Sequence, residues 1–263
     1  MENIILQSFL WIGLLGLIIG TALAIAAKYL AVKEDPRIAE VHELLPGANC
    51  GACGYAGCAD FARAVVMDGE DISLCSPGGA EGAAAIAKLM GVGAGTVEKK
   101  LAIVLCCGDD EKAKRRFVYN GLNDCAAAHA TAGGDKACVY GCLGYGSCAR
   151  VCPVNAIRIE KGIAVVNREL CIGCGKCVAA CPRNLIKMVP ASARIHVLCS
   201  SMDKGTEVKR VCSTGCIGCQ LCTKFGDEGA FKMDGFLAKV DYSIPVTKEE
   251  VVEKCPSKCI VKV

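Results

Sequence analysis

Cysteine spacing is the feature that most constrains this chain. Residues 171–182 read CIGCGKCVAACP, a C-x2-C-x2-C-x3-C-P pattern formed by Cys171, Cys174, Cys177, Cys181 and Pro182. This spacing is typical of [4Fe–4S] ligation, in which three close cysteines hold one cluster and the fourth holds a neighbouring cluster. A zinc site rarely uses four such closely spaced cysteines followed by a proline. We therefore expect iron–sulfur clusters.

A second cysteine run lies upstream and has a wider spacing, C-x3-C-x5-C-x3-C-P, formed by Cys138, Cys142, Cys148, Cys152 and Pro153. Crossed ligation predicts two clusters. One would use Cys138, Cys142, Cys148 and Cys181, and the other would use Cys152, Cys171, Cys174 and Cys177. The segments after both prolines, VNAIRI and RNLIKM, predict a short helix and then a strand, with residues 162–167 as a partner strand. Residues 131–190 thus read as a two-cluster ferredoxin-like domain.

Residues 191–263 read as a degenerate copy of that domain. Cys216, Cys219, Cys222 and Cys255 keep one complete ligand set. The other set is replaced together, by Gly226, Pro245, Lys248 and Val251. We expect one cluster here, on a fold that keeps its strands, including one at residues 236–241. Cys212 could replace Cys219 as a ligand, but Cys219 has the more regular spacing.

A fourth group of cysteines lies near the N-terminus. Cys50, Cys53, Cys58 and Cys75 have the spacing C-x2-C-x4-C-x16-C, with glycines between the first three. Glycine lets backbone amides approach cluster sulfur closely. Residues 59–68 suit a short helix, so residues 46–78 are expected to form a small helical [4Fe–4S] domain. Zinc is the alternative occupant.

Several cysteines fall outside these patterns, namely Cys106, Cys107, Cys125, Cys199 and Cys212. They can be small buried hydrophobic residues, or they can form an extra cluster or a redox pair. Internal repetition is visible here, since IVLC at 103–106 resembles HVLC at 196–199. Cys259 occupies the position of Leu185 in the other unit and is expected in the core.

The N-terminal segment is uncharged from Asn3 to Ala27. Roughly 20 apolar residues cross the hydrocarbon of a bilayer, so residues 1–30 read as a single transmembrane anchor. Lys28, Lys33 and Arg37 follow it, which places the bulk of the chain on the cytoplasmic side. A cleaved signal or a buried core helix is the alternative.

The remaining segments complete an α+β chain of 263 residues. Residues 31–45 read as a connector and 79–130 as a hinge with a small α/β segment. The net charge of +3 is too small to indicate nucleic-acid binding. Lys112, Lys114, Arg115 and Arg116 form a basic patch, which is either solvated surface or a contact for an acidic partner such as ferredoxin.

No catalytic nucleophile–base pair, phosphate-binding loop or dinucleotide motif is evident. A chain with about four [4Fe–4S] clusters and no bond-making site suits one-electron relay. The alternative is a membrane-tethered cluster store or redox sensor without turnover.

The order of these motifs resembles a known family. LLPGANCGACGYAGC, KACVYGCLGYGSCARVCP, CIGCGKCVAACP and HVLCSSMDKG follow one another as in the B subunits of the Rnf complex, an ion-translocating ferredoxin:NAD oxidoreductase. The resemblance implies a relay subunit of the cytoplasmic membrane. It would accept electrons from reduced ferredoxin and pass them to membrane and NAD-reducing subunits that transport Na⁺ or H⁺. It also implies that the cysteines of the four groups ligate clusters.

Overall fold

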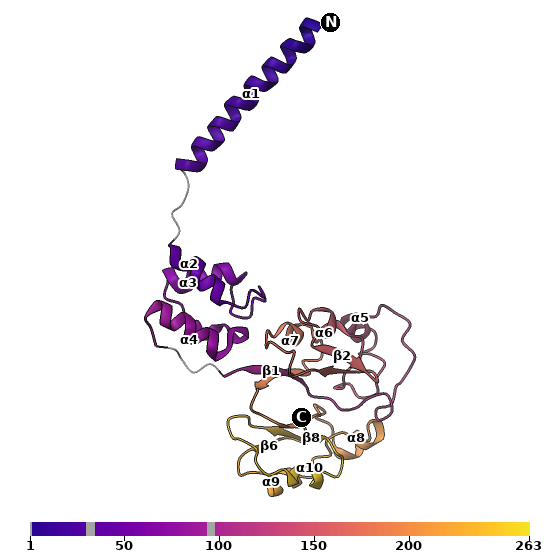
Figure 1. Cartoon of the computed structure of the whole chain (residues 1–263). Helices are drawn as coiled ribbons and strands as arrows, with labels where there is room; N and C mark the ends of the chain where they lie inside the picture. Colours follow the sequence, from indigo (N-terminus) through magenta and orange to yellow (C-terminus); the bar gives the residue numbers. More distant parts are fainter. Residues whose placement is uncertain (1, 30–34, 94–97) are drawn as a thin grey trace.

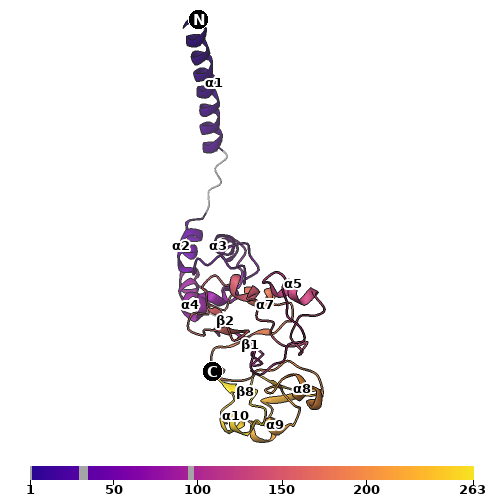
Figure 2. The ribbon, with the colours of Figure 1, turned by 90° about the vertical axis from the view of Figure 1, so that its right-hand side faces the viewer.

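The computed structural model describes residues 2–29, 35–93 and 98–263. The first helix, α1 (Glu2–Tyr29), projects away from the rest of the chain in Figure 1 and Figure 2. Its window Phe9–Ala26 is apolar and has no buried residue. Within the described ranges it is the one helix long and apolar enough to cross a membrane, as the sequence predicts.

A small helical body follows. It contains α2 (Pro36–Leu44), α3 (Cys58–Met67), η1 (Ile72–Leu74), η2 (Ser76–Gly78) and α4 (Gly79–Met90). Pro36 starts α2, and the Asp35 side chain caps that helix by accepting the Arg37 N–H at 2.9 Å. Ile38 and Val41 of α2 share one core with residues of α3 and α4. The packed body therefore extends on both sides of residues 46–78. The predicted hinge falls partly on residues 94–97, outside the described residues.

The rest of the chain contains two units of identical topology. The first has strands β1 (Lys100–Val104), β2 (Ile157–Glu160), β3 (Ile163–Val166) and β4 (Ile186–Pro190), with helices α5 (Cys125–Ala130), α6 (Ser147–Arg150) and α7 (Lys176–Ala180). The second has β5 (Ile195–Val197), β6 (Phe231–Asp234), β7 (Leu237–Val240) and β8 (Ile260–Lys262), with α8 (Gly205–Val211), α9 (Leu221–Phe225) and α10 (Glu250–Lys254). In each unit the outer strands pair antiparallel, β1 with β4 and β5 with β8, and the inner strands form a hairpin.

The same turn follows each Cys-Pro pair. Asn155, Asn184 and Lys258 have φ values of 50°, 52° and 51°, and each donates its N–H to the carbonyl of the cysteine three residues earlier. A residue in this left-handed region ends helical geometry. The prediction of a short helix after each proline is therefore wrong. The chain turns directly into β2, β4 or β8, and the helices α6, α7 and α10 precede the prolines. The strands predicted at 162–167 and 236–241 are confirmed as β3 and β7.

In the second unit, apolar side chains fill the region where the four replaced cysteines of the other ligand set would lie. Val251 is 1% exposed and belongs to the same core as Phe231. A Cβ added to Gly226 would lie 2.5 Å from Cδ2 of Phe231, so a cysteine no longer fits there. The neighbouring loop is held by the Asp227 carboxylate, which accepts hydrogen bonds from the backbone N–H groups of Thr247 and Lys248 at 2.6 and 3.1 Å.

Replacing this buried valine tests that account. Val251→Ala removes two methyl groups from a filled core and is expected to destabilise the second unit by about 2 kcal/mol. Val263→Ala is the matched control, because Val263 is 42% exposed. Denaturant unfolding followed by circular dichroism measures both variants. Equal midpoints for the two variants would show that Val251 does not take over the packing of the missing cluster.

Candidate iron–sulfur centres

The first centre lies in the helical body. The thiol of Cys75 interacts electrostatically with those of Cys50, Cys53 and Cys58, so the structure brings the predicted set together. Cys58 begins α3, and its N–H donates to Oδ1 of Asn49 at 2.8 Å, which fixes the loop that carries the first two cysteines. Burial raises the pKa of the Cys75 thiol.

The second centre differs from the predicted set at one position. Cys142, Cys148 and Cys181 line one cavity, and the fourth cysteine of its wall is Cys125 in place of Cys138. Cys125 begins α5, and its N–H donates to Oγ of Ser147 in α6 at 2.8 Å. The same hydroxyl donates to the Asp124 carboxylate, also at 2.8 Å. These bonds hold α5 against α6 and bring Cys125 to the cavity.

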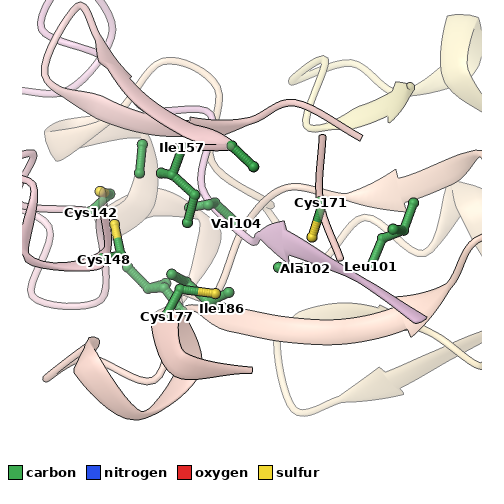
Figure 3. Close-up of a cluster of buried hydrophobic side chains, with 12 residues drawn as sticks. Leu101, Ala102, Val104, Cys142, Cys148, Ile157, Cys171, Cys177 and Ile186 are labelled. Carbon is green, nitrogen blue, oxygen red and sulfur yellow. The ribbon is translucent and has the colours of Figure 1, made fainter. Parts of the chain in front are cut away.

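The third centre joins Cys152 to Cys171, Cys174 and Cys177, as crossed ligation predicts. The other three thiols of this set interact electrostatically with Cys177, and burial raises its pKa to about 11. The N–H of Ala156 donates to Sγ of Cys152 at 3.2 Å. Figure 3 shows Cys142 and Cys148 together at one end of the first unit's core and Cys171 at the other end.

The fourth centre lies in the second unit. Cys216, Cys219, Cys222 and Cys255 line one cavity, and Cys212 does not reach it. Cys259 also lines this cavity and is 2% exposed, so its predicted place in the core is confirmed. Its Sγ lies 3.7 Å from Sγ of Cys255. Hydrogen bonding to Cys259 lowers the pKa of Cys255 to about 5 and that of Cys216 to about 6.

These four sets fit [4Fe–4S] clusters in their donor chemistry, since each offers four cysteine sulfurs. Burial raises the pKa of Cys148 to about 12 and that of Cys222 to about 11, so these ligands would ionise only beside a cation such as iron. Among the described residues, no three His, Cys, Asp or Glu side chains are grouped to hold a single metal ion.

One buried and one half-buried cation, Lys136 and Arg183, complement the thiols of the first unit. Lys136 is fully buried, and its Nζ donates to the carbonyl oxygens of Gly108 and Gly162 at 2.7 and 3.2 Å. The guanidinium of Arg183, on the wall of the second centre, donates to the carbonyl oxygens of Cys138 and Gly141. Within the described part of the chain neither cation has a carboxylate partner. Buried cations need a nearby negative charge, which anionic clusters would supply.

The basic patch predicted at residues 112–116 is largely paired within the chain. Lys112 binds Asp109 at 2.5 Å, and Arg115 binds Asp110 and Asp135. Arg116 donates to the carbonyl oxygens of Ala132 and Gly134. Three of the four charged side chains already have partners within the chain. These side chains therefore stabilise the fold of the first unit.

Cysteines missed by motif spacing line a further cavity. Cys106, Cys107, Cys199 and Cys212 lie there with Cys138. The signal that points to them in the sequence is the internal repeat that relates IVLC to HVLC.

Three family models match the chain at these centres. The FeS family, described as an Fe–S cluster, matches residues 45–77. The LdpA Fe-S cluster-binding domain matches residues 146–192, and the 4Fe-4S dicluster domain matches residues 170–225. These matches support the iron–sulfur interpretation and the ferredoxin-like fold.

Three relatives are similar over nearly the whole chain. The B subunit of the Na(+)-translocating ferredoxin:NAD(+) oxidoreductase complex of Acetobacterium woodii is 45% identical over 99% of this chain and 78% of its own length. The B subunit of the ion-translocating oxidoreductase complex of Methanosarcina acetivorans is 41% identical over 99% of both chains. The B subunit of the proton-translocating ferredoxin:NAD(+) oxidoreductase complex of Clostridium ljungdahlii is 40% identical over 98% of this chain and 92% of its own. The chain therefore belongs to the family of B subunits of ion-translocating oxidoreductase complexes.

Proposed function

We propose that this subunit accepts electrons from reduced ferredoxin and relays them towards membrane and NAD-reducing subunits, coupled to Na⁺ or H⁺ transport. The observation that carries the proposal is the presence of several four-thiol centres on one chain, together with the names of its relatives. Bound [4Fe–4S] clusters would supply reversible one-electron chemistry. The chain's own residues set the position, hydrogen bonding and burial of each centre.

The proposed ligand sets follow the positions of the thiols. They are Cys50, Cys53, Cys58 and Cys75; Cys125, Cys142, Cys148 and Cys181; Cys152, Cys171, Cys174 and Cys177; and Cys216, Cys219, Cys222 and Cys255. Backbone N–H groups that donate to sulfur, such as Ala156 to Cys152, stabilise the thiolate form and tune the potential.

Electrons are proposed to enter through the fourth centre. Cys219 is exposed, whereas the other cysteines of these sets are buried or half-buried. Lys224 and Phe225 of α9 are exposed nearby in sequence, and Nζ of Lys254 in α10 lies 5.6 Å from the Phe225 ring centroid. Basic side chains around an exposed centre suit an acidic electron donor such as ferredoxin, because opposite charges steer encounter.

The chain is associated with a membrane, as its family and the exposed apolar helix α1 indicate. We propose that α1 crosses the membrane once and that the cluster-bearing units lie on the cytoplasmic side. The supporting observation is the basic residues that follow the apolar segment, including Lys28 in the last turn of α1.

Stopped-flow reduction of the anaerobic full-length protein by reduced ferredoxin tests this function. The visible absorption of the clusters is expected to bleach. Lys224→Glu with Lys254→Glu should slow the second-order rate about tenfold at low ionic strength and much less at high salt, because salt screens steering. Lys88→Glu, an exposed change on α4, is the matched control and should leave the rate unchanged.

Two other outcomes would contradict the proposal. If dithionite reduces the clusters and ferredoxin does not, while intact clusters pass to apo-proteins, the chain is a cluster store. If ferredoxin reduces the protein at a rate that neither the lysine variants nor salt changes, electron entry lies elsewhere.

Cys125→Ala tests the ligand that motif spacing did not reveal. The variant is expected to lose between about one and about four irons per chain and to lose the EPR signal of one [4Fe–4S] cluster or gain that of a three-iron cluster. Cys107→Ala removes a half-buried thiol that lies outside the four proposed sets and lines neither the cavity of the second centre nor that of the fourth, and it should keep all the iron. An unchanged iron content in Cys125→Ala would show that Cys125 is not the fourth ligand of the second centre.

A further inference from the structure

A cavity lies between the two ferredoxin-like units and is lined by five cysteines that form no part of the four proposed sets. They are Cys106, Cys107, Cys138, Cys199 and Cys212. Like the cavities at the second and fourth centres, it is lined by at least four cysteines among apolar side chains. The three cavities thus agree in the chemistry of their walls.

Four of these five cysteines are related by the internal repeat. Cys106 follows β1 as Cys199 follows β5, and Leu105 and Leu198, which precede them, donate their N–H groups to the equivalent residues Leu185 and Cys259. Sγ of Cys106 accepts the Cys142 N–H at 3.4 Å, and Sγ of Cys199 accepts the Cys216 N–H at 3.2 Å. In each unit, therefore, the sulfur of the cysteine after the first strand is held by an equivalent backbone N–H···S hydrogen bond.

The second pair obeys the same relation. Cys138 stands four residues before Cys142, as Cys212 stands four residues before Cys216. A glycine precedes the later cysteine in both units, Gly141 and Gly215, and both glycines line the cavity. Each unit thus contributes one cysteine after its first strand and one before its first ferredoxin-type ligand.

Cys107 is the fifth thiol and differs from the other four. Its counterpart in the second unit is Ser200, which is not a usual cluster ligand. Its Sγ lies 3.5 Å from the carbonyl oxygen of Thr214, the geometry of a thiol that donates. The sulfurs of Cys106 and Cys199 accept backbone N–H groups, which would stabilise the thiolate form.

The units are tied together around this cavity. The N–H of Cys107 donates to the carbonyl of Leu198 at 3.0 Å, and the N–H of Lys114 donates to that of Val211 at 2.9 Å. Ala113 and Cys212 form a β-bridge. Gly108 permits this approach, since a Cβ there would lie 3.1 Å from Sγ of Cys212 and 3.9 Å from Sγ of Cys106. The sulfurs contributed by the two units thus converge on one space.

Positive charge adjoins the cavity. Lys136, fully buried and without a carboxylate partner among the described residues, donates to the carbonyl of Gly108 on its wall. Arg183 donates to the carbonyls of Cys138 and Gly141, also on the wall. Both arrangements suit an anionic group bound between the units.

We propose that Cys106, Cys138, Cys199 and Cys212 ligate a fifth [4Fe–4S] cluster that bridges the two ferredoxin-like units. The proposal extends the proposed relay and rests on it, because a cluster at this junction links the centres of the first unit to the exposed centre of the second. One electron would enter it from a reduced neighbouring cluster and leave to the next, with ferredoxin as the source.

Iron and acid-labile sulfide counting with Mössbauer spectroscopy on the anaerobic full-length protein tests the proposal. We expect about twenty irons and about twenty sulfides per chain, where four clusters would give about sixteen of each. Cys212→Ala should lower the iron by between about one and about four and remove one cluster signal. Cys107→Ala is the matched control in the same cavity and should keep all the iron.

Three results would overturn the proposal. They are about sixteen irons in the unmodified protein, zinc in the cavity, and a loss in Cys107→Ala equal to that in Cys212→Ala. The count on the unmodified protein decides the matter even if Cys212→Ala fails to fold. The iron count requires no ferredoxin, so it is independent of the proposed function. A protein that holds about twenty irons but is not reduced by ferredoxin would refute the proposed function and leave the fifth cluster in place.

Discussion

Burial among apolar side chains raises the pKa of a thiol, so a buried cysteine keeps its proton unless a hydrogen bond or a neighbouring positive charge stabilises the thiolate. Cys148, Cys177 and Cys222 are buried, and burial raises the pKa of each to about 11 or 12. Side chains of this kind become useful ligands only when iron offsets the cost of the thiolate. Since only 5% of the residues are aromatic, the cores of the two units consist mainly of aliphatic side chains and cysteines.

The second unit shows what replaces a cluster when its ligands are absent. The same strands and the same turn after Cys255-Pro256 remain. Val251 and Phe231 fill the interior, and the Asp227 carboxylate holds the loop around Thr247 through backbone hydrogen bonds. Apolar packing and the Asp227 carboxylate thus hold the core and the loop in the place of a cluster. This explains why the fold tolerates the replacement of all four cysteine positions.

Local spacing was sufficient to predict that the thiols of the third centre lie close together, because they come from two short motifs, and the repeat predicted the strands β3 and β7. Cys125 could not be predicted in this way, since it reaches its cavity through tertiary contacts. Its N–H bonds to Ser147, which docks α5 on α6 across more than twenty residues of chain. No spacing rule encodes such a contact. The short helix expected after Pro153 failed for a local reason, because a single left-handed residue, Asn155, outweighed the helical preference of the segment.

The duplicated unit explains the position of the remaining thiols. Cys106 and Cys138 of the first unit supply half of the ligand set proposed for this cavity. When a second copy docks with Cys199 and Cys212 in the equivalent places, the two half-sites face one another across the interface. The backbone bonds from Cys107 to Leu198 and from Lys114 to Val211 fix that approach. A binding site made from two equal halves requires both units to be folded and docked, so coordination there would couple the stability of the interface to the continuity of the electron path.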